Sequence, residues 1–142
     1  MVMLGLAGGT RTCIHTPGAA LKPEDVTPEL CERLLDNAKL VYFDGRLTEA
    51  AFVVARAARA AGIPILVEAE RLRPDLDVLM AQADFIVTSN NFPEDWTGED
   101  NVGDAVLATV LRLPAVQFMV CCGSPPTCDW KLCHCTNPAP PH

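Results

Sequence analysis

The chain has 142 residues, of which 49% are hydrophobic, and a formal net charge of −7 at pH 7. This length suits one domain with one core, and the acidic balance argues against nucleic acid or an anionic membrane as the main partner. No apolar run reaches the roughly 18 residues that a membrane-spanning helix needs, and the first seven residues lack the basic flank of a signal peptide. We expect a soluble protein of the cytoplasm, with a plastid location left open.

Helical and extended patterns alternate along the chain from residue 23 onward. Amphipathic or Ala-rich runs predict helices near 28–37, 48–61, 75–82 and 101–112. Apolar runs predict strands near 39–44, 63–68, 84–88 and 115–121. Such alternation predicts an α/β fold with a parallel sheet, right-handed crossovers and helices on both faces.

Capping residues mark several of these boundaries. Thr27 precedes Pro28 and is the expected N-cap of the first helix, and Thr48 is the expected N-cap of the second. Gly62 is expected to end the second helix. Residues 89–93 read as a turn.

Charged residues follow the first two predicted strands. Asp44, Gly45 and Arg46 end the first strand, and Glu68 and Glu70 end the second. The carboxyl ends of parallel strands share one edge, where α/β proteins bind their ligands. These residues therefore predict a site at that edge.

A structural alternative remains open for each of these groups. Asp44 and Arg46 can cap their own turn and pair with each other. The two glutamates can likewise pair with Arg71 or Arg73. Further along, the sequence between Arg73 and Arg112 contains acids and no base, which predicts a solvated face. The acids are Asp75, Asp77, Asp84, Glu94, Asp95, Glu99, Asp100 and Asp104.

Segments 9–17, 41–46 and 65–71 together resemble the middle of ribokinase-like (pfkB) carbohydrate kinases, most closely ketohexokinase-like and plant-type members. The resemblance covers about residues 9–120, after a divergent segment 1–8, and implies a partial three-layer Rossmann-type core. It also implies ATP and Mg²⁺ as cofactors and a sugar as the substrate that accepts the phosphoryl group.

The resemblance assigns roles to individual residues. It places Arg11 near the nucleotide phosphates, where a guanidinium fork suits phosphate oxygens; the alternative is a strand arginine that faces solvent. It places Asp44, Gly45 and Arg46 in the sugar and phosphate region, and it lets Glu68 and Glu70 organise Mg²⁺ through water.

The chain also departs from the family pattern. Ser89 and Phe92 stand where many members have the Asn and Glu of an Asn-x-x-Glu motif, so we assign no metal ligand. The Thr-Leu-Gly-x-x-Gly turn and the Gly-x-Gly-Asp motif, which supplies the catalytic base, are absent from these 142 residues. We therefore expect the chain alone to have no catalytic residue, to bind no cofactor and to be an inactive fragment or truncated isoform. The alternative is a non-catalytic interaction protein whose open sheet edges promote oligomerisation.

The last 22 residues, 121–142, differ from the rest in composition. They contain five of the seven cysteines and five of the twelve prolines. We expect this tail to be disordered. A small zinc or disulfide module on Cys128, Cys133, His134 and Cys135 is the alternative.

Overall fold

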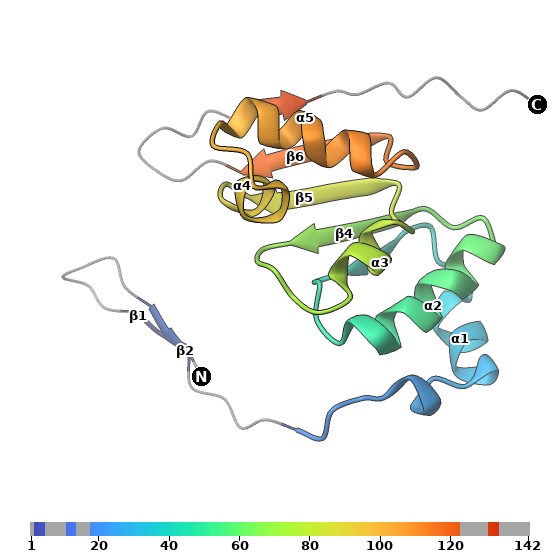
Figure 1. Cartoon of the computed structure of the whole chain (residues 1–142). Helices are drawn as coiled ribbons and strands as arrows, with labels where there is room; N and C mark the ends of the chain where they lie inside the picture. The colour runs from blue at the N-terminus through green and yellow to red at the C-terminus, as the bar shows by residue number, and fades with distance from the viewer. Residues whose placement is uncertain (1, 5–10, 14–17, 123–130, 134–142) are drawn as a thin grey trace, which may run out of the picture.

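The structure, a computed structural model, describes residues 2–4, 11–13, 18–122 and 131–133. Its main element is a five-stranded sheet with the strand order β3-β4-β5-β6-β7 (Figure 1). These strands are β3 (Val41–Phe43), β4 (Ile65–Ala69), β5 (Phe85–Ser89), β6 (Phe118–Cys122) and β7 (Lys131–Cys133). The first four run parallel, and β7 is antiparallel to β6. The predicted parallel α/β fold is confirmed, because each of the four predicted strands is present.

The helices connect these strands in the expected order. They are the 3₁₀ helix η1 (Pro23–Asp25) and the α-helices α1 (Pro28–Leu35), α2 (Thr48–Ala60), α3 (Leu76–Met80), α4 (Phe92–Thr97) and α5 (Val102–Arg112). Helix α4 begins inside the segment expected to be a turn. Pro93 lies in its first turn, where a missing N–H costs nothing, and Gly98 ends it at φ 80°.

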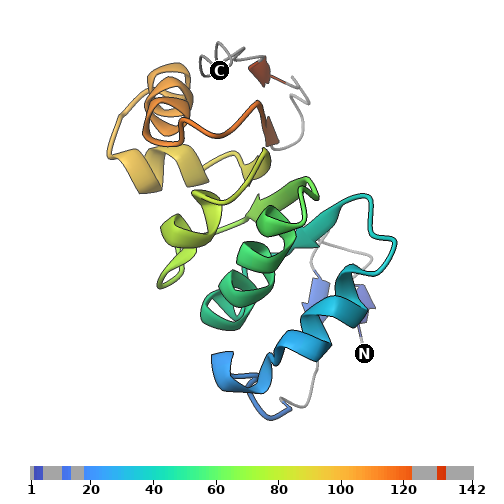
Figure 2. The same ribbon diagram turned by 90° about the vertical axis from the view of Figure 1, so that its right-hand side faces the viewer.

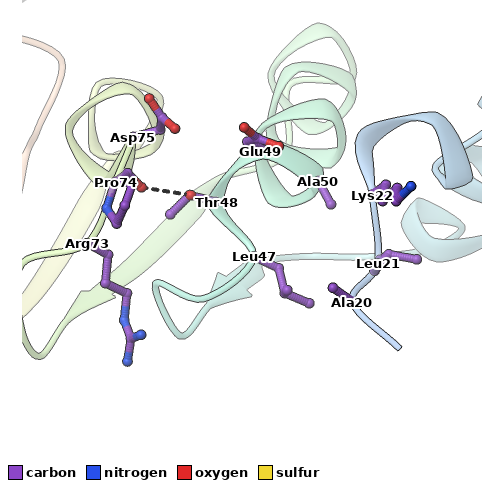
Figure 3. Close-up of a pocket in the computed structure, with 10 residues that line it drawn as sticks. All are labelled: Ala20, Leu21, Lys22, Leu47, Thr48, Glu49, Ala50, Arg73, Pro74 and Asp75. Atoms are coloured by element: carbon purple, nitrogen blue, oxygen red, sulfur yellow. Dashed lines mark hydrogen bonds between the residues drawn. The ribbon is translucent and has the colours of Figure 1, made fainter. Parts of the chain in front are cut away.

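The caps of α1 and α2 differ from each other. Thr27 caps α1 as predicted, since its Oγ1 accepts a hydrogen bond from Leu30 N at 3.3 Å. Thr48 does not cap α2: it is the first helical residue, and Leu47 precedes the helix at φ 49° without a side-chain bond. The Thr48 hydroxyl instead donates to Pro74 O at 2.8 Å and ties α2 to the β4–α3 loop (Figure 3). Gly62 follows α2 at φ 68°, as expected of a terminating glycine.

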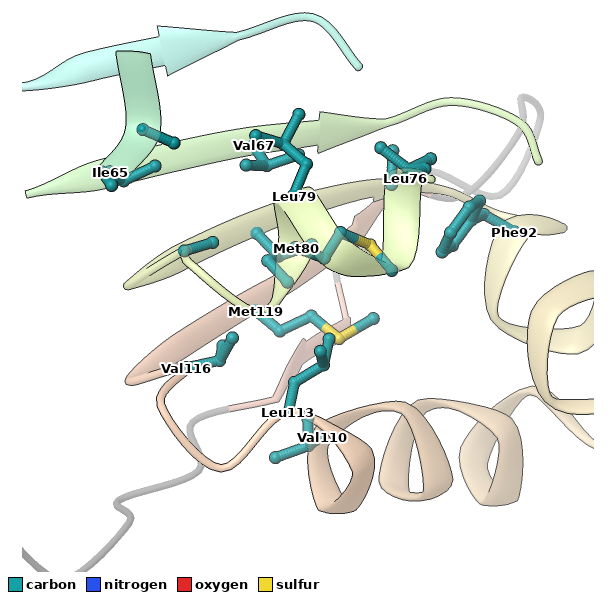
Figure 4. Packing of buried hydrophobic residues seen from close by; sticks show 14 of the residues in the cluster. Ile65, Val67, Leu76, Leu79, Met80, Phe92, Val110, Leu113, Val116 and Met119 are labelled. Atoms are coloured by element: carbon teal, nitrogen blue, oxygen red, sulfur yellow. The ribbon is translucent and has the colours of Figure 1, made fainter. Parts of the chain in front are cut away.

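The hydrophobic core lies between one face of the sheet and helices α2 to α5 (Figure 4). Residues 65, 67 and 69 of β4 are fully buried, whereas residues 66 and 68 on the opposite face are only partly buried. Ile86 and Met119 continue the buried face onto the next two strands. Figure 2 shows the connecting helices along this side of the strands.

The opposite face carries partly buried apolar side chains and no connecting helix among the described residues. Leu66, Phe85 and Phe118 lie in register across it. The strands are added in one direction, and right-handed crossovers then place every connecting helix on the same face. The helical layer expected on the second face is therefore not formed by α2 to α5.

Asp84 is the one member of the acidic run that is buried, at 7% exposed. Its carboxylate accepts hydrogen bonds from Arg59 Nη1 at 2.7 Å and from Ile65 N at 2.9 Å. The prediction of a solvated face is wrong at this position, because Asp84 joins the end of α2 to the start of β4.

The described residues near the two chain ends form further strands. β1 (Val2–Leu4) and β2 (Arg11–Cys13) pair as a separate antiparallel sheet across the predicted boundary at residue 8. At the other end, β6 continues through Cys122, and β7 pairs with it. Residues 121–122 and 131–133 of the tail therefore lie in strands. The rest of the tail, including Cys128, His134 and Cys135, lies outside the described residues.

None of the helices within the described ranges is long and apolar enough to span a bilayer.

Candidate functional site

The carboxyl ends of β3 and β4 bring four of the predicted site residues together. The two strands pair in register, with Phe43 beside Val67. Asp44, Gly45 and Arg46 follow one strand, and Glu68 lies at the end of the other. The expected meeting of these residues at one sheet edge is what the structure shows.

Gly45 lets the turn after β3 approach β4 closely. Its φ is 69°, and an added Cβ would lie 2.7 Å from the Glu68 carbonyl oxygen. A side chain would therefore meet both backbone strain and a steric clash with a backbone atom. Because residue 45 is glycine, the Asp-Gly-Arg turn can lie directly against the end of β4.

Asp44 and Arg46 form a local pair across that glycine. Asp44 Oδ1 accepts from Arg46 N at 3.0 Å, and Oδ2 lies 3.5 Å from Arg46 Nε. Their side chains are 52% and 66% exposed. An exposed ion pair of this kind contributes little stability, so both groups are available to a ligand at small cost. The structure thus shows the alternative in which the two residues cap their own turn and pair with each other.

Tyr42 is a site residue that the sequence analysis missed. Its hydroxyl donates to Glu68 Oε2 on the neighbouring strand. This hydrogen bond, with partial desolvation and the negative charges of Glu68 and Asp44, raises the pKa of Tyr42 to about 12 against the opposing charge of Arg46. Tyr42 and Glu68 lie on the same sheet face, and Glu68 is two residues beyond the strand partner of Tyr42. This spacing is the signal in the sequence that could have indicated their contact.

Glu70 lies on the same edge but forms a separate group. Its Oε1 lies 3.0 Å from Arg71 Nη2, as the structural alternative predicted. Ser89, at the end of β5, donates to the Glu70 carbonyl oxygen at 2.6 Å. The backbone after β4 is therefore anchored to β5, and the two charged side chains extend outward.

Arg11 is not brought to this edge by strand pairing. It begins β2, which pairs with β1 in the separate sheet. Its side chain is outside what the structure describes. The predicted contact between Arg11 and nucleotide phosphates stays a prediction.

The carboxylates of this edge do not fit a Mg²⁺ site. Asp44 pairs with Arg46, Glu68 accepts from Tyr42, and Glu70 pairs with Arg71. Within the described residues, no three His, Cys, Asp or Glu side chains are grouped to hold a metal ion. The exposed cations Arg46 and Arg71 fit an anionic ligand better.

Two concave surfaces flank the site. A cavity of about 350 Å³ lies where α2 begins, between the segment at Leu21 and the β4–α3 loop at Arg73 (Figure 3). A second of about 390 Å³ runs beside β3 between α1 and α2, and Arg46 is its one charged lining residue. The first is lined by charges of both signs, and the second is mostly apolar.

Comparison with known proteins identifies this fold. The chain is similar to 2-dehydro-3-deoxygluconokinase from Thermotoga maritima, with a TM-score of 0.63 and 14% identity over 84% of this chain and 44% of that one. It is similar to a PfkB protein from Polaromonas sp. JS666, with a TM-score of 0.58 and 17% identity over 73% and 39% of the two chains. It is also similar to a candidate ribokinase from Agrobacterium tumefaciens, with a TM-score of 0.56 and 28% identity over 86% and 39%.

These neighbours are sugar kinases of the ribokinase-like (PfkB) class, and the described fold is part of theirs. The chain spans between 39% and 44% of the length of these three structures. No protein-family model matches the sequence. No curated protein matches it either.

Proposed function

We propose that this chain is a part of a ribokinase-like sugar kinase, in which the whole protein transfers a phosphoryl group from ATP, with Mg²⁺, to a sugar hydroxyl. The observation that supports this most is the likeness to sugar-kinase structures over 84% and 86% of the chain. The ketohexokinase-like, plant-type branch belongs to the same proposal and rests on the sequence resemblance. A cytoplasmic location, with a plastid left open, is part of the same proposal.

Within this proposal, the Asp-Gly-Arg turn contacts the sugar or its phosphate. Arg46 is exposed, and its ion pair with the exposed Asp44 contributes little stability, so a ligand anion can replace Asp44 beside the guanidinium. Glu68, with Tyr42, fixes the wall of the site beside the turn. Glu70 flanks the site, and Arg11 is assigned to the nucleotide.

The chain alone is proposed to be inactive. Phosphoryl transfer needs a placed base and donors around the transferring group. Asp44 and Glu70 already pair with neighbouring arginines and are well exposed, and the Gly-x-Gly-Asp segment is absent. Neither acid has the buried, fixed environment of a placed general base.

A second candidate function is a non-catalytic interaction protein. The observation that favours it is the apolar surface beside the edge strand β3.

The assignment is tested by ligand titration of the ¹⁵N-labelled chain. Sugar phosphates and ATP with Mg²⁺ are added separately, and backbone amide shifts are followed. We expect sugar phosphates to shift Gly45 and Arg46 with a Kd of about 1 mM, equivalent to roughly 4 kcal/mol of binding energy. Arg46→Gln should remove the effect, whereas Arg56→Gln, on the exposed side of α2, should keep it. Shifts that are absent, or that persist in Arg46→Gln, contradict the site.

A coupled assay tests the proposed inactivity. The purified chain is incubated with ATP, Mg²⁺ and a panel of ketoses and aldoses. We expect no sugar phosphate above a blank without protein. Product formation would show that a residue of this chain acts as the base.

A further inference from the structure

An apolar groove borders the edge strand β3. Nine large apolar side chains of the described residues are exposed, and five of them line this one groove. The five are Leu21, Leu34, Leu40, Tyr42 and Leu47, each between 45% and 55% exposed. Single exposed leucines are ordinary, but a cluster in one concave surface indicates an interaction site.

On the side of β3 that faces away from β4, the backbone groups have no partner among the residues that the structure describes. Residues of a parallel strand point their N–H and C=O groups alternately to the two sides. Val41 N donates to Pro64 O at 2.9 Å, toward β4. The N–H and C=O of Tyr42 therefore point away from β4, where no described strand pairs with β3. An edge of this kind is a template for another strand.

The charge distribution along the chain favours a second copy of this chain as the partner at the groove. Between residues 18 and 60, which include the groove, there are six bases and seven acids. Between residues 61 and 122 there are three bases and ten acids. The half that carries the groove is therefore nearly neutral, and the long-range repulsion of an acidic chain originates mainly in the other half. Two copies can meet at β3 with their acidic halves apart.

We propose that two copies of this chain pair through β3 about a two-fold axis, antiparallel and centred on Tyr42, with the leucine groove of each copy covered in the dimer. A two-fold axis through the edge makes the paired strands antiparallel, and the same patch serves both copies. Tyr42 of each copy then exchanges two hydrogen bonds with Tyr42 of the other. The apolar lining suits a second identical surface better than a charged partner. This inference does not depend on the kinase assignment.

Sedimentation velocity of the full chain, from about 5 to about 200 μM, tests the dimer. We expect a monomer–dimer equilibrium within this range, which corresponds to roughly 5 to 7 kcal/mol of association energy. Leu34→Lys should raise the dimer Kd at least tenfold. Because the new lysine makes the chain less acidic, the loss cannot come from general repulsion. Leu111→Lys is the matched control on α5, where Leu111 is 73% exposed and outside the groove, and it should leave the Kd unchanged.

The backbone contact is tested at Tyr42 itself. Tyr42→Pro removes the outward N–H together with the phenol ring and leaves the backbone bonds to β4, so it should weaken the dimer at least tenfold, and by more than Tyr42→Ala, which loses the ring but keeps the N–H. Tyr42→Phe keeps the N–H and should retain the dimer. Circular dichroism checks that all three variants are folded, and hydrogen exchange of the wild-type Tyr42 amide should slow as concentration rises.

Three outcomes overturn the proposal. One is a monomer over the whole concentration range, which would leave the groove to a different partner. Another is a dimer that Leu34→Lys and Leu111→Lys weaken equally. The third is a dimer in which the Tyr42 amide exchanges at the monomer rate.

Discussion

The two ends of the parallel sheet use their carboxylates in opposite ways. At the amino end, Asp84 is buried and accepts from both Arg59 and the backbone of Ile65. At the carboxyl end, Asp44 and Glu70 pair with neighbouring arginines in the chain, and their side chains are 52% and 43% exposed. At the amino end, the Asp84 carboxylate therefore links α2, β4 and the start of β5. The carboxyl end keeps charged groups in solvent, where a ligand can compete for them.

The two ends therefore differ in whether their acids contribute stability or remain available for binding. A buried acceptor that satisfies a backbone N–H is costly to remove, because the remaining donor stays desolvated. An exposed pair costs little to break. Four measurements test this contrast, ordered from the largest expected effect to the smallest.

Removal of the buried carboxylate should have the largest effect. Asp84→Ala leaves Ile65 N and Arg59 without their acceptor, and we expect a loss of about 3 kcal/mol in the free energy of unfolding in urea. Asp84→Asn keeps an acceptor for Ile65 N and should lose about half as much. Asp44→Ala at the other end should change stability by less than about 0.5 kcal/mol. Equal losses for Asp84→Ala and Asp44→Ala would contradict the contrast between the two ends.

Gly45 and Gly62 separate steric contact from backbone strain. Both have φ near 70°, but an added Cβ meets Glu68 O only at Gly45 and meets nothing within 4 Å at Gly62. We expect Gly62→Ala to cost about 1 kcal/mol through strain alone. Gly45→Ala should cost about 2 kcal/mol because the turn must also move from β4. Thermal unfolding of both variants measures the difference. Equal losses of stability would show that the turn can move away from β4 without an energetic cost.

Thr88, near the carboxyl end of β5, carries a buried hydroxyl without a hydrogen-bond partner among the described residues. Thr88→Val replaces the hydroxyl with a methyl group of similar shape. We expect a gain of about 1 kcal/mol in the free energy of unfolding, because an unsatisfied buried group is removed. Thr109→Val is the control, since its hydroxyl donates to Ala105 O at 2.8 Å; it should not stabilise the protein. A loss of stability in Thr88→Val would mean that the hydroxyl has a partner.

The smallest effect concerns Tyr42, the one tyrosine of the chain. Its pKa is raised to about 12 from the ordinary value of 10. A folded-state pKa above the unfolded value means that the stabilisation is complete below pH 10 and is lost as the pH rises from 10 to 12. Ultraviolet titration should show this late ionisation, and Glu68→Gln should lower the pKa toward 10. An unchanged pKa in Glu68→Gln would exclude the Tyr42–Glu68 hydrogen bond as its cause.

Local signals in the sequence determined the order and type of most elements. Thr27 caps α1, Gly62 ends α2, and apolar runs mark all four parallel strands. These signals act over a few residues along the chain, so they can be recognised without knowledge of the fold. The meeting of Asp44 with Glu68 also followed, because parallel strands that end in polar residues present them at one edge.

Only the tertiary structure decided which partners these residues take. The bonds from Tyr42 to Glu68 and from Thr48 to Pro74 each join residues 26 apart, and the bond from Ile65 to Asp84 joins residues 19 apart. Strand register and helix packing determine such pairs, and neither can be recognised from one local segment of the sequence. The placement of α2 to α5 on a single face has the same origin, because it depends on the direction in which successive strands join the sheet.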